Sequence, residues 1–292
     1  MKDEPDIPLR VTENLAEAEE WMLVLEADGL SPAVRHTSRG FALVVPASEA
    51  EQAVTALAAY ETENPPVLQV EDEPHGAGYL IAGFTVAGVL LAFFSITGEP
   101  NPGSLWFKRG SSDAAYLLGG ELWRSVTALT LHVDLGHAIS NAIAMALFLS
   151  AVCRSLGPGL GIAIVLLAGA GGNLANALLQ GPTHVSVGAS TSVFAAVGVV
   201  VSLAVARRRR RGSYGRRVWL PIAAGFALLA MLGTGQYRVD LWAHLLGLLT
   251  GSLLGAAVAI YYHRAPGPRV QWTLAGASLA LVIGCWALAL RY

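Results

Sequence analysis

Two short stretches, far apart in the chain, carry residue types that together could perform acyl transfer. Gly188-Ala189-Ser190 places a serine at the start of one long apolar segment, and His244 lies just inside the start of another. Hydroxyl and imidazole groups are costly in apolar surroundings unless they have polar partners. A serine beside a histidine is the minimal pairing of a nucleophile and its general base. The sequence therefore predicts a nucleophilic serine, Ser190, if the fold brings His244 beside it.

A second group of polar residues lies earlier in the chain. His137 and Asn141 are four residues apart, so they project from one face of a helix, and His132 precedes His137 by five residues. Two hydrogen-bond donors beside a nucleophile are what an oxyanion hole requires. A zinc site is the competing interpretation, but two histidines spaced by five with no glutamate between them fit no helical zinc motif. We therefore expect an oxyanion hole, with no metal and no cofactor.

The composition places these residues in a membrane. Of the 292 residues, 54% are hydrophobic and 14% are charged, whereas soluble domains carry about 25% charged residues. The charge is also uneven, because 16 of the 21 acidic residues precede residue 74. This asymmetry indicates an acidic, water-soluble N-terminal part and a membrane-embedded remainder.

Seven apolar segments approach the length of about 20 residues that crosses a bilayer. They cover residues 79–96, 136–152, 160–179, 187–206, 218–232, 241–262 and 270–290. The segment 136–152 is marginal, and 218–232 is short enough to need help from its flanks and tilted neighbours. We predict seven transmembrane helices.

Residues 1–70 have a different pattern, typical of a small α/β domain. It predicts strands at 7–11, 33–36, 41–45 and 67–70, a helix over 13–27 capped by Thr12, and a second helix from Ser48. The order β-α-β-β-α-β indicates a ferredoxin-like unit. Residues 71–78 then form an acidic linker.

The arginines set the expected orientation, because cytoplasmic loops are rich in Lys and Arg. The predicted loops on the side of the N-terminal domain hold ten arginines, including the run 207–211, and those on the other side hold five basic residues. We expect a multi-pass protein of the bacterial inner membrane, with its N-terminus in the cytoplasm and its C-terminus outside. We interpret the arginine run as a topology anchor that contacts membrane lipids, and not as a site for nucleic acid.

With this topology, Ser190 and His244 both lie about one helical turn inside the outer face. These features also have a purely structural interpretation. A lone serine in a membrane helix usually bonds to its own helix backbone, and regularly spaced glycines usually serve helix packing alone. However, Gly247 and Gly251 follow His244 on one helical face and would let its helix press against that of Ser190. Phe194 could pack on the His244 ring. The matched depth favours the catalytic interpretation.

Residues 79–262 resemble the rhomboid family of intramembrane serine proteases. The resemblance rests on Glu121-Leu122-Trp123-Arg124, on the H-x-x-x-x-H-x-x-x-N spacing of His132, His137 and Asn141, on Gly188-x-Ser190, and on Ala243-His244 followed by Gly247 and Gly251. It implies a mainly α fold: a rhomboid-like six-helix core at 79–262, with an additional C-terminal transmembrane helix within 263–292.

The resemblance also implies a role for each motif residue. Ser190 would be the nucleophile and His244 the general base of a dyad, and the substrates would be transmembrane proteins cut near the outer face. The remaining implied roles are the oxyanion hole (His137, Asn141 and the Ser190 amide), an aromatic against the histidine (Phe194), the motif glycine (Gly188) and support in the first outer loop (His132, Glu121, Trp123 and Arg124).

Three residues depart from this pattern or compete with it. Thr191 stands where the family commonly has glycine, and Ser192 is a rival nucleophile that we expect on another helical face. Asp240 lies one turn before His244, and we interpret it as a helix N-cap and not as a third catalytic residue. An inactive rhomboid-like protein that binds membrane clients is the alternative function. A transporter is disfavoured, since the chain has no inverted repeat.

Overall fold

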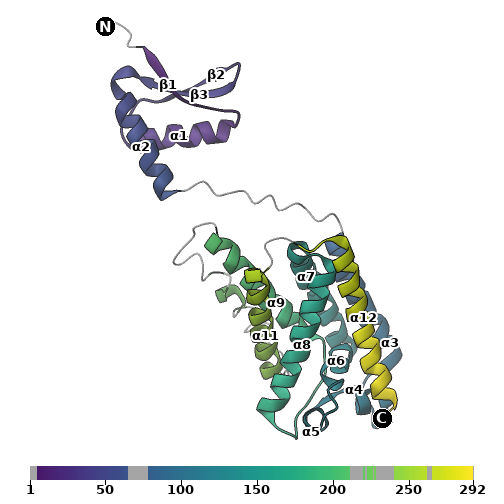
Figure 1. The fold of residues 1–292 in the computed structure, drawn as a ribbon. Helices are drawn as coiled ribbons and strands as arrows, with labels where there is room; N and C mark the ends of the chain where they lie inside the picture. Colours follow the sequence, from purple (N-terminus) through teal and green to yellow (C-terminus); the bar gives the residue numbers. More distant parts are fainter. Residues whose placement is uncertain are drawn as a thin grey trace. The chain divides into compact units, whose positions relative to one another are not determined.

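The computed structural model describes residues 5–64, 78–210, 220, 222–225, 227, 240–261 and 265–291 (Figure 1). The chain divides into two compact units, Met1–Val70 and Glu71–Tyr292. Each unit has its own buried core, and each is described by itself.

The N-terminal unit is a three-stranded antiparallel sheet with two helices. Its elements are β1 (Asp6–Thr12), α1 (Leu15–Ala27), β2 (Ala33–Thr37), β3 (Gly40–Pro46), a 3₁₀ turn (Ala47–Glu49) and α2 (Ala50–Glu63). The sheet order β1-β3-β2 leaves β3 between the two strands that α1 connects, which is a split βαβ arrangement. Leu25, Leu43, Val45 and Leu57 form its buried centre. The predicted strand 67–70 lies outside the described residues.

One local prediction in this unit is wrong. Thr12 does not cap α1, because β1 continues through that residue. Asn14 is the N-cap, and its side chain accepts a hydrogen bond from the Ala16 amide at 3.0 Å. Asparagine is at least as good an N-cap as threonine, so the helix begins where the better cap lies.

The second unit is a bundle of helices long and apolar enough to cross a membrane. Among the described residues these helices are α3 (Gly78–Thr97), α7 (Leu135–Leu156), α8 (Pro158–Gln180), α9 (Ser190–Arg210), α11 (Leu241–Tyr261) and α12 (Pro268–Arg291). They correspond to six of the seven predicted spans. The seventh, 218–232, falls mostly outside the described residues.

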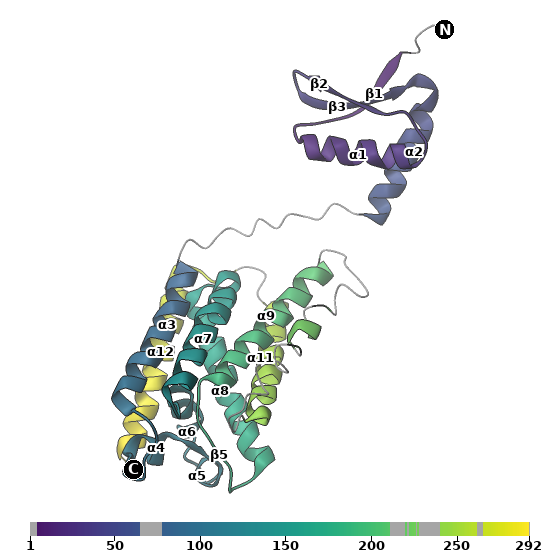
Figure 2. The same cartoon turned by 180° about the vertical axis from the view of Figure 1, so that it is seen from behind.

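The helices α9 and α11 pack backbone to backbone, side by side in Figures 1 and 2. A Cβ atom added to Gly247 would lie 2.3 Å from the Thr191 carbonyl oxygen, and one added to Gly251 would lie 2.1 Å from that of Ala195. One turn further along both helices, a Cβ on Gly255 would meet Val199. The predicted glycine face is therefore the seam between α9 and α11, and the two helices run in the same direction.

The connection between α3 and α7 contains more structure than the single long loop expected from the sequence. It forms α4 (Leu105–Gly110), β4 (Ser112–Asp113), α5 (Ala114–Leu118), α6 (Arg124–Thr127) and a 3₁₀ turn (Ala128–Thr130). β4 pairs antiparallel with β5 (Val185–Ser186), which ends two residues before Gly188. This connection, residues 98–134, therefore holds the segment that leads into α9.

The C-terminal helix α12 packs on the 98–134 segment. The Trp286 ring lies 5.1 Å from that of Trp106 in this segment, and 5.3 Å from that of Phe93 in α3, centroid to centroid. Its indole nitrogen donates to the Thr130 hydroxyl at 3.1 Å. The additional helix is thus an integral support of the segment that leads to the candidate site.

Candidate active site

In the turn before α9, the side chains of His137 and Ser190 both lie close to Gly188. Gly188 has φ +130°, a conformation that side chains rarely adopt. A Cβ atom there would lie 2.7 Å from Cε1 and 2.9 Å from Nε2 of His137, and 3.6 Å from Ser190 Oγ. Glycine is therefore required at position 188 both by the backbone and by the close approach of the imidazole.

His132 and its neighbours hold this turn in place. The Ala189 amide donates to His132 Nε2 at 3.4 Å, and the Gly188 amide donates to the Ala128 carbonyl at 2.9 Å. His132 is completely buried. Burial, and then the neighbouring His137, lower the pKa of His132 to about 4. The imidazole is therefore neutral at pH 7 and accepts the Ala189 amide, which is a supporting role.

His244 is oriented by an aromatic ring and not by a carboxylate. Its ring stacks on Phe194 with 4.5 Å between centroids and an interplanar angle of 28°, as the sequence predicted. The residue is 6% exposed, and its Nδ1 has no hydrogen-bond partner among the described residues. The seam aligns the first turns of α9 and α11, so Ser190 and His244 lie at the same end of adjoining helices. In the described part of the chain, no hydrogen bond joins them.

Asp240 caps α11 and does not bond to the His244 side chain. Its Oδ1 accepts from the Ala243 amide at 3.0 Å, so the predicted N-cap is confirmed. Its Oδ2 lies 2.7 Å from Asn176 Nδ2 and 2.7 Å from His184 Nε2. Burial alone would raise the pKa of the Asp240 carboxyl, but the hydrogen bonds from Ala243, His184 and Asn176 outweigh it, and the pKa lies below its usual value.

The three-residue cluster of Asn176, His184 and Asp240 was not predicted. It ties α8, the loop before Gly188 and the first turn of α11 together beside His244. No sequence signal marked it, because its members come from three elements whose meeting depends on the tertiary fold.

The residues predicted to form an oxyanion hole lie on α7 and at the start of α9. Asp134 caps α7 by accepting from the His137 amide at 2.7 Å. Asn141, one turn further along, is 6% exposed, and its Nδ2 is buried without a partner among the described residues. Such a donor is costly unless something accepts from it. The first amides of α9 are a further set of donors, as at every helix N-terminus.

The structure also separates Ser190 from its two neighbours. A Cβ atom on Gly169 would lie 1.9 Å from Ser192 Oγ, so that hydroxyl faces α8. The Thr191 methyl group faces Gly172 of α8. A Cβ atom added to Gly172 would lie 2.7 Å from that methyl group. The β-branched Thr191 is thus accommodated where α8 has a glycine, and its methyl group packs on α8.

The Glu121, Trp123 and Arg124 motif organises the 98–134 segment. Arg124 is 3% exposed, and its Nε donates to Glu121 at 2.7 Å. Its Nη1 donates to the carbonyls of Lys108 and Ser111, and its guanidinium lies over the Tyr116 ring. A buried arginine needs this full set of partners. Trp123 packs in the apolar cluster around Trp286.

Comparison with known proteins gives a family match. The sequence model of the rhomboid domain matches residues 119–261. YdcA of Bacillus subtilis, named as a candidate rhomboid protease, is 27% identical over 178 residues, which are 60% of this chain and 87% of YdcA. Rhomboid protease GluP of the same bacterium is 27% identical over 161 residues, 55% of this chain but 31% of GluP. Rhomboid-like protease 3 of Toxoplasma gondii is 28% identical over 213 residues, 71% of this chain and 76% of the relative.

The matched region contains α7, α8, α9 and α11 together with the seam and the turn at Gly188. The chain is a multi-pass membrane protein whose residues 119–261 match the rhomboid domain.

Proposed function

We propose that this protein is an intramembrane serine endopeptidase in which Ser190 is the nucleophile and His244 the general base. The observation that carries the proposal is the glycine seam, which aligns the starts of α9 and α11 with a stacked histidine beside the Gly188 turn. The rhomboid-domain match over residues 119–261 and the three relatives named as proteases support the same reaction class.

The chemistry follows from the roles of these groups. As Ser190 Oγ attacks the peptide carbonyl carbon, His244 accepts the hydroxyl proton. The negative charge on the carbonyl oxygen is stabilised by donors from Asn141, His137 and the Ser190 amide. The protonated His244 then gives its proton to the leaving amine, and a water molecule, activated in the same way, hydrolyses the acyl-enzyme.

The substrates we propose are transmembrane proteins, cut near the outer membrane face. α9 begins at Ser190 and carries Arg207, Arg208, Arg209 and Arg210 in its last turn, so the candidate site and the arginine run lie at opposite ends of one helix. Since arginine-rich ends face the cytoplasm, the site faces outward, and the N-terminal unit is cytoplasmic. We propose the bacterial inner membrane as the location.

A second candidate function is the binding of membrane clients without cleavage. One observation favours it: no hydrogen bond joins Ser190 to His244 in the described part of the chain. Catalytic hydrogen bonds are often long or misaligned without substrate, so this geometry does not exclude cleavage. The two proposals differ in whether substrate is cut.

Cleavage of a single-span model substrate in liposomes tests the proposal. Wild type and Ser192→Ala are expected to cut it, and mass spectrometry should map the cut near the outer end of the span. Ser190→Ala and His244→Ala are expected to leave the substrate intact. Folded wild type that binds the substrate but never cuts it would support the second function. Cleavage by Ser190→Ala would exclude Ser190 as the nucleophile.

A further inference from the structure

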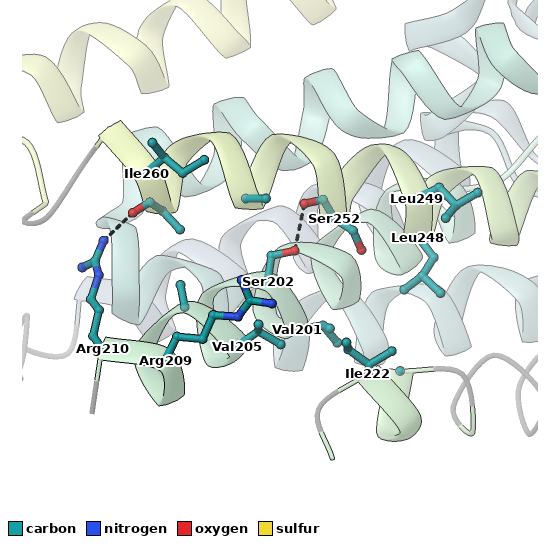
Figure 3. A pocket seen from close by; sticks show the side chains of 14 residues that line it. Val201, Ser202, Val205, Arg209, Arg210, Ile222, Leu248, Leu249, Ser252 and Ile260 are labelled. Atoms are coloured by element: carbon teal, nitrogen blue, oxygen red, sulfur yellow. Dashed lines mark hydrogen bonds between the residues drawn. The ribbon is translucent and has the colours of Figure 1, made fainter. Parts of the chain in front are cut away.

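A cavity of about 640 Å³ lies along one side of the α9–α11 pair, where Ile222 and Gly225 also line it, and it reaches the end that carries the arginine run (Figure 3). Its volume falls within the range of about 300–1,000 Å³ that is typical of ligand pockets. Most of its lining is aliphatic, including Val201, Val205, Leu248 and Ile260. Its lining runs from Leu248, one helical turn after His244, to Ile260 at the far end of α11, and it contains none of the candidate catalytic residues.

A hydroxyl in the middle of this cavity already donates to the protein. The Ser202 hydroxyl donates to the Ser252 carbonyl at 2.8 Å, across the two helices. A hydroxyl that already donates to the protein has less need of a ligand. The body of the cavity therefore suits a hydrocarbon better than a polar molecule.

The mouth of the cavity is cationic. Arg209 and Arg210 both line it, and Figure 3 shows the Arg209 side chain reaching into it. Arg210 donates to the Ala259 carbonyl at the end of α11, which fixes its guanidinium beside the opening. Guanidinium groups bind phosphate oxygens through paired N–H donors.

The length of the cavity matches one leaflet of a bilayer. From Val201 to Arg210, α9 rises about 14 Å at 1.5 Å per residue. The hydrocarbon core of a bilayer is about 30 Å thick, so this is about half of it. Basic pockets between transmembrane helices at the cytoplasmic side are general sites for anionic lipid headgroups.

We propose that this cavity binds one anionic glycerophospholipid, with an acyl chain along the outer side of α9 and α11 and its phosphate on Arg209. The inference does not depend on the proposed protease activity, because none of its residues lies in the candidate active site. A fatty acid would fill the apolar body but place a carboxylate, with two oxygens and no glycerol linkage, where the lipid places its phosphate. A zwitterionic lipid would carry a compensating positive charge beside the guanidinium.

Photo-crosslinking tests this site. The full-length protein is reconstituted in phosphatidylcholine nanodiscs and exposed to phosphatidylglycerol with a diazirine in one acyl chain. Adducts are mapped by mass spectrometry. We expect adducts in residues 201–209 and 248–260, at least severalfold more than with the matching phosphatidylcholine probe. An unlabelled fatty acid should compete less well than unlabelled phosphatidylglycerol.

Three variants make the test specific. Arg209→Gln should weaken phosphatidylglycerol binding about fivefold, the effect of one basic residue near an anionic surface. Ala256→Phe should abolish the cavity adducts, because Ala256 lines the cavity and a phenyl ring would fill it. Arg269→Gln removes an exposed arginine at the same end but outside the cavity lining, and should change nothing.

Equal labelling by both lipid probes, equal competition by the fatty acid, or unchanged labelling in Arg209→Gln would each overturn the phosphate assignment. Cavity adducts that persist in folded Ala256→Phe would overturn the site itself. Arg209 is exposed, so its replacement leaves the fold intact and keeps the test decisive.

Discussion

The seam between α9 and α11 leads to a sharp prediction for Gly247→Ala. The added Cβ would lie 2.3 Å from the Thr191 carbonyl oxygen, where ordinary contacts begin at 3.4 Å. Because the obstacle is backbone, the two helices must separate by about 1 Å. A misplacement of about 1 Å in a catalytic arrangement can cost about 100-fold in rate. Gly247 directly follows the His244 turn, so the displacement falls on the dyad.

The assay is the rate at which a fluorophosphonate probe labels the purified, detergent-solubilised protein. Gly247→Ala should react about 100-fold more slowly than wild type. The matched control is Gly284→Ala, a glycine-to-alanine change in transmembrane helix α12 with nothing within 4 Å of the added Cβ. It should label like wild type. Thermal unfolding of each variant establishes that the comparison is between folded proteins. Wild-type labelling by folded Gly247→Ala would refute the idea that the seam positions the dyad.

Three further predictions concern the residues around the dyad. Phe194→Ala removes the ring stacked on His244 and should slow probe labelling; because Phe194 is buried, it should also destabilise the fold by about 3–5 kcal/mol in a denaturation measurement. The pKa of His132 is about 4 in the folded protein and about 6.5 unfolded, so wild type should lose on the order of 3 kcal/mol of stability as pH falls from 6.5 to 4. His132→Gln should flatten that part of the pH profile, and an unchanged profile would contradict the assignment. The pKa of Asp240 lies below its usual value, so its stabilisation is present above about pH 4 and is lost below it. Asp240→Asn should therefore lower the unfolding temperature at pH 7 and bring it closer to wild type at pH 3; an equal difference at both pH values would argue against an ionised cap.

The spacing of residues in the sequence predicted much of the fold. Gly247, Gly251 and Gly255 recur at four residues, and a row of glycines on one helical face has a single efficient use in a bundle, which is close helix packing. The Asp240 N-cap could also be predicted from the sequence, because an N-cap involves only the residues of one helical turn. Long apolar segments of about 20 residues were equally clear for the helices that the structure describes.

Residue spacing could not predict the short helices or the long-range contacts. The 98–134 segment folds into helices of four to six residues, too short to produce a periodic pattern. Arg124 and Trp286 order it through partners that no spacing rule connects. The cluster of Asn176, His184 and Asp240 likewise exists only after α8, the 184 loop and α11 have packed together. The Thr12 cap failed because two good capping residues lay within two positions of each other.

The most direct test of the central claim is to identify the residue that a fluorophosphonate modifies in the folded wild-type protein. Peptide mass spectrometry locates the adduct, and His244→Ala provides the comparison. The dyad predicts one adduct, on Ser190, formed in wild type and lost in His244→Ala. An adduct on Ser192, or labelling of Ser190 that is just as fast without His244, would contradict it.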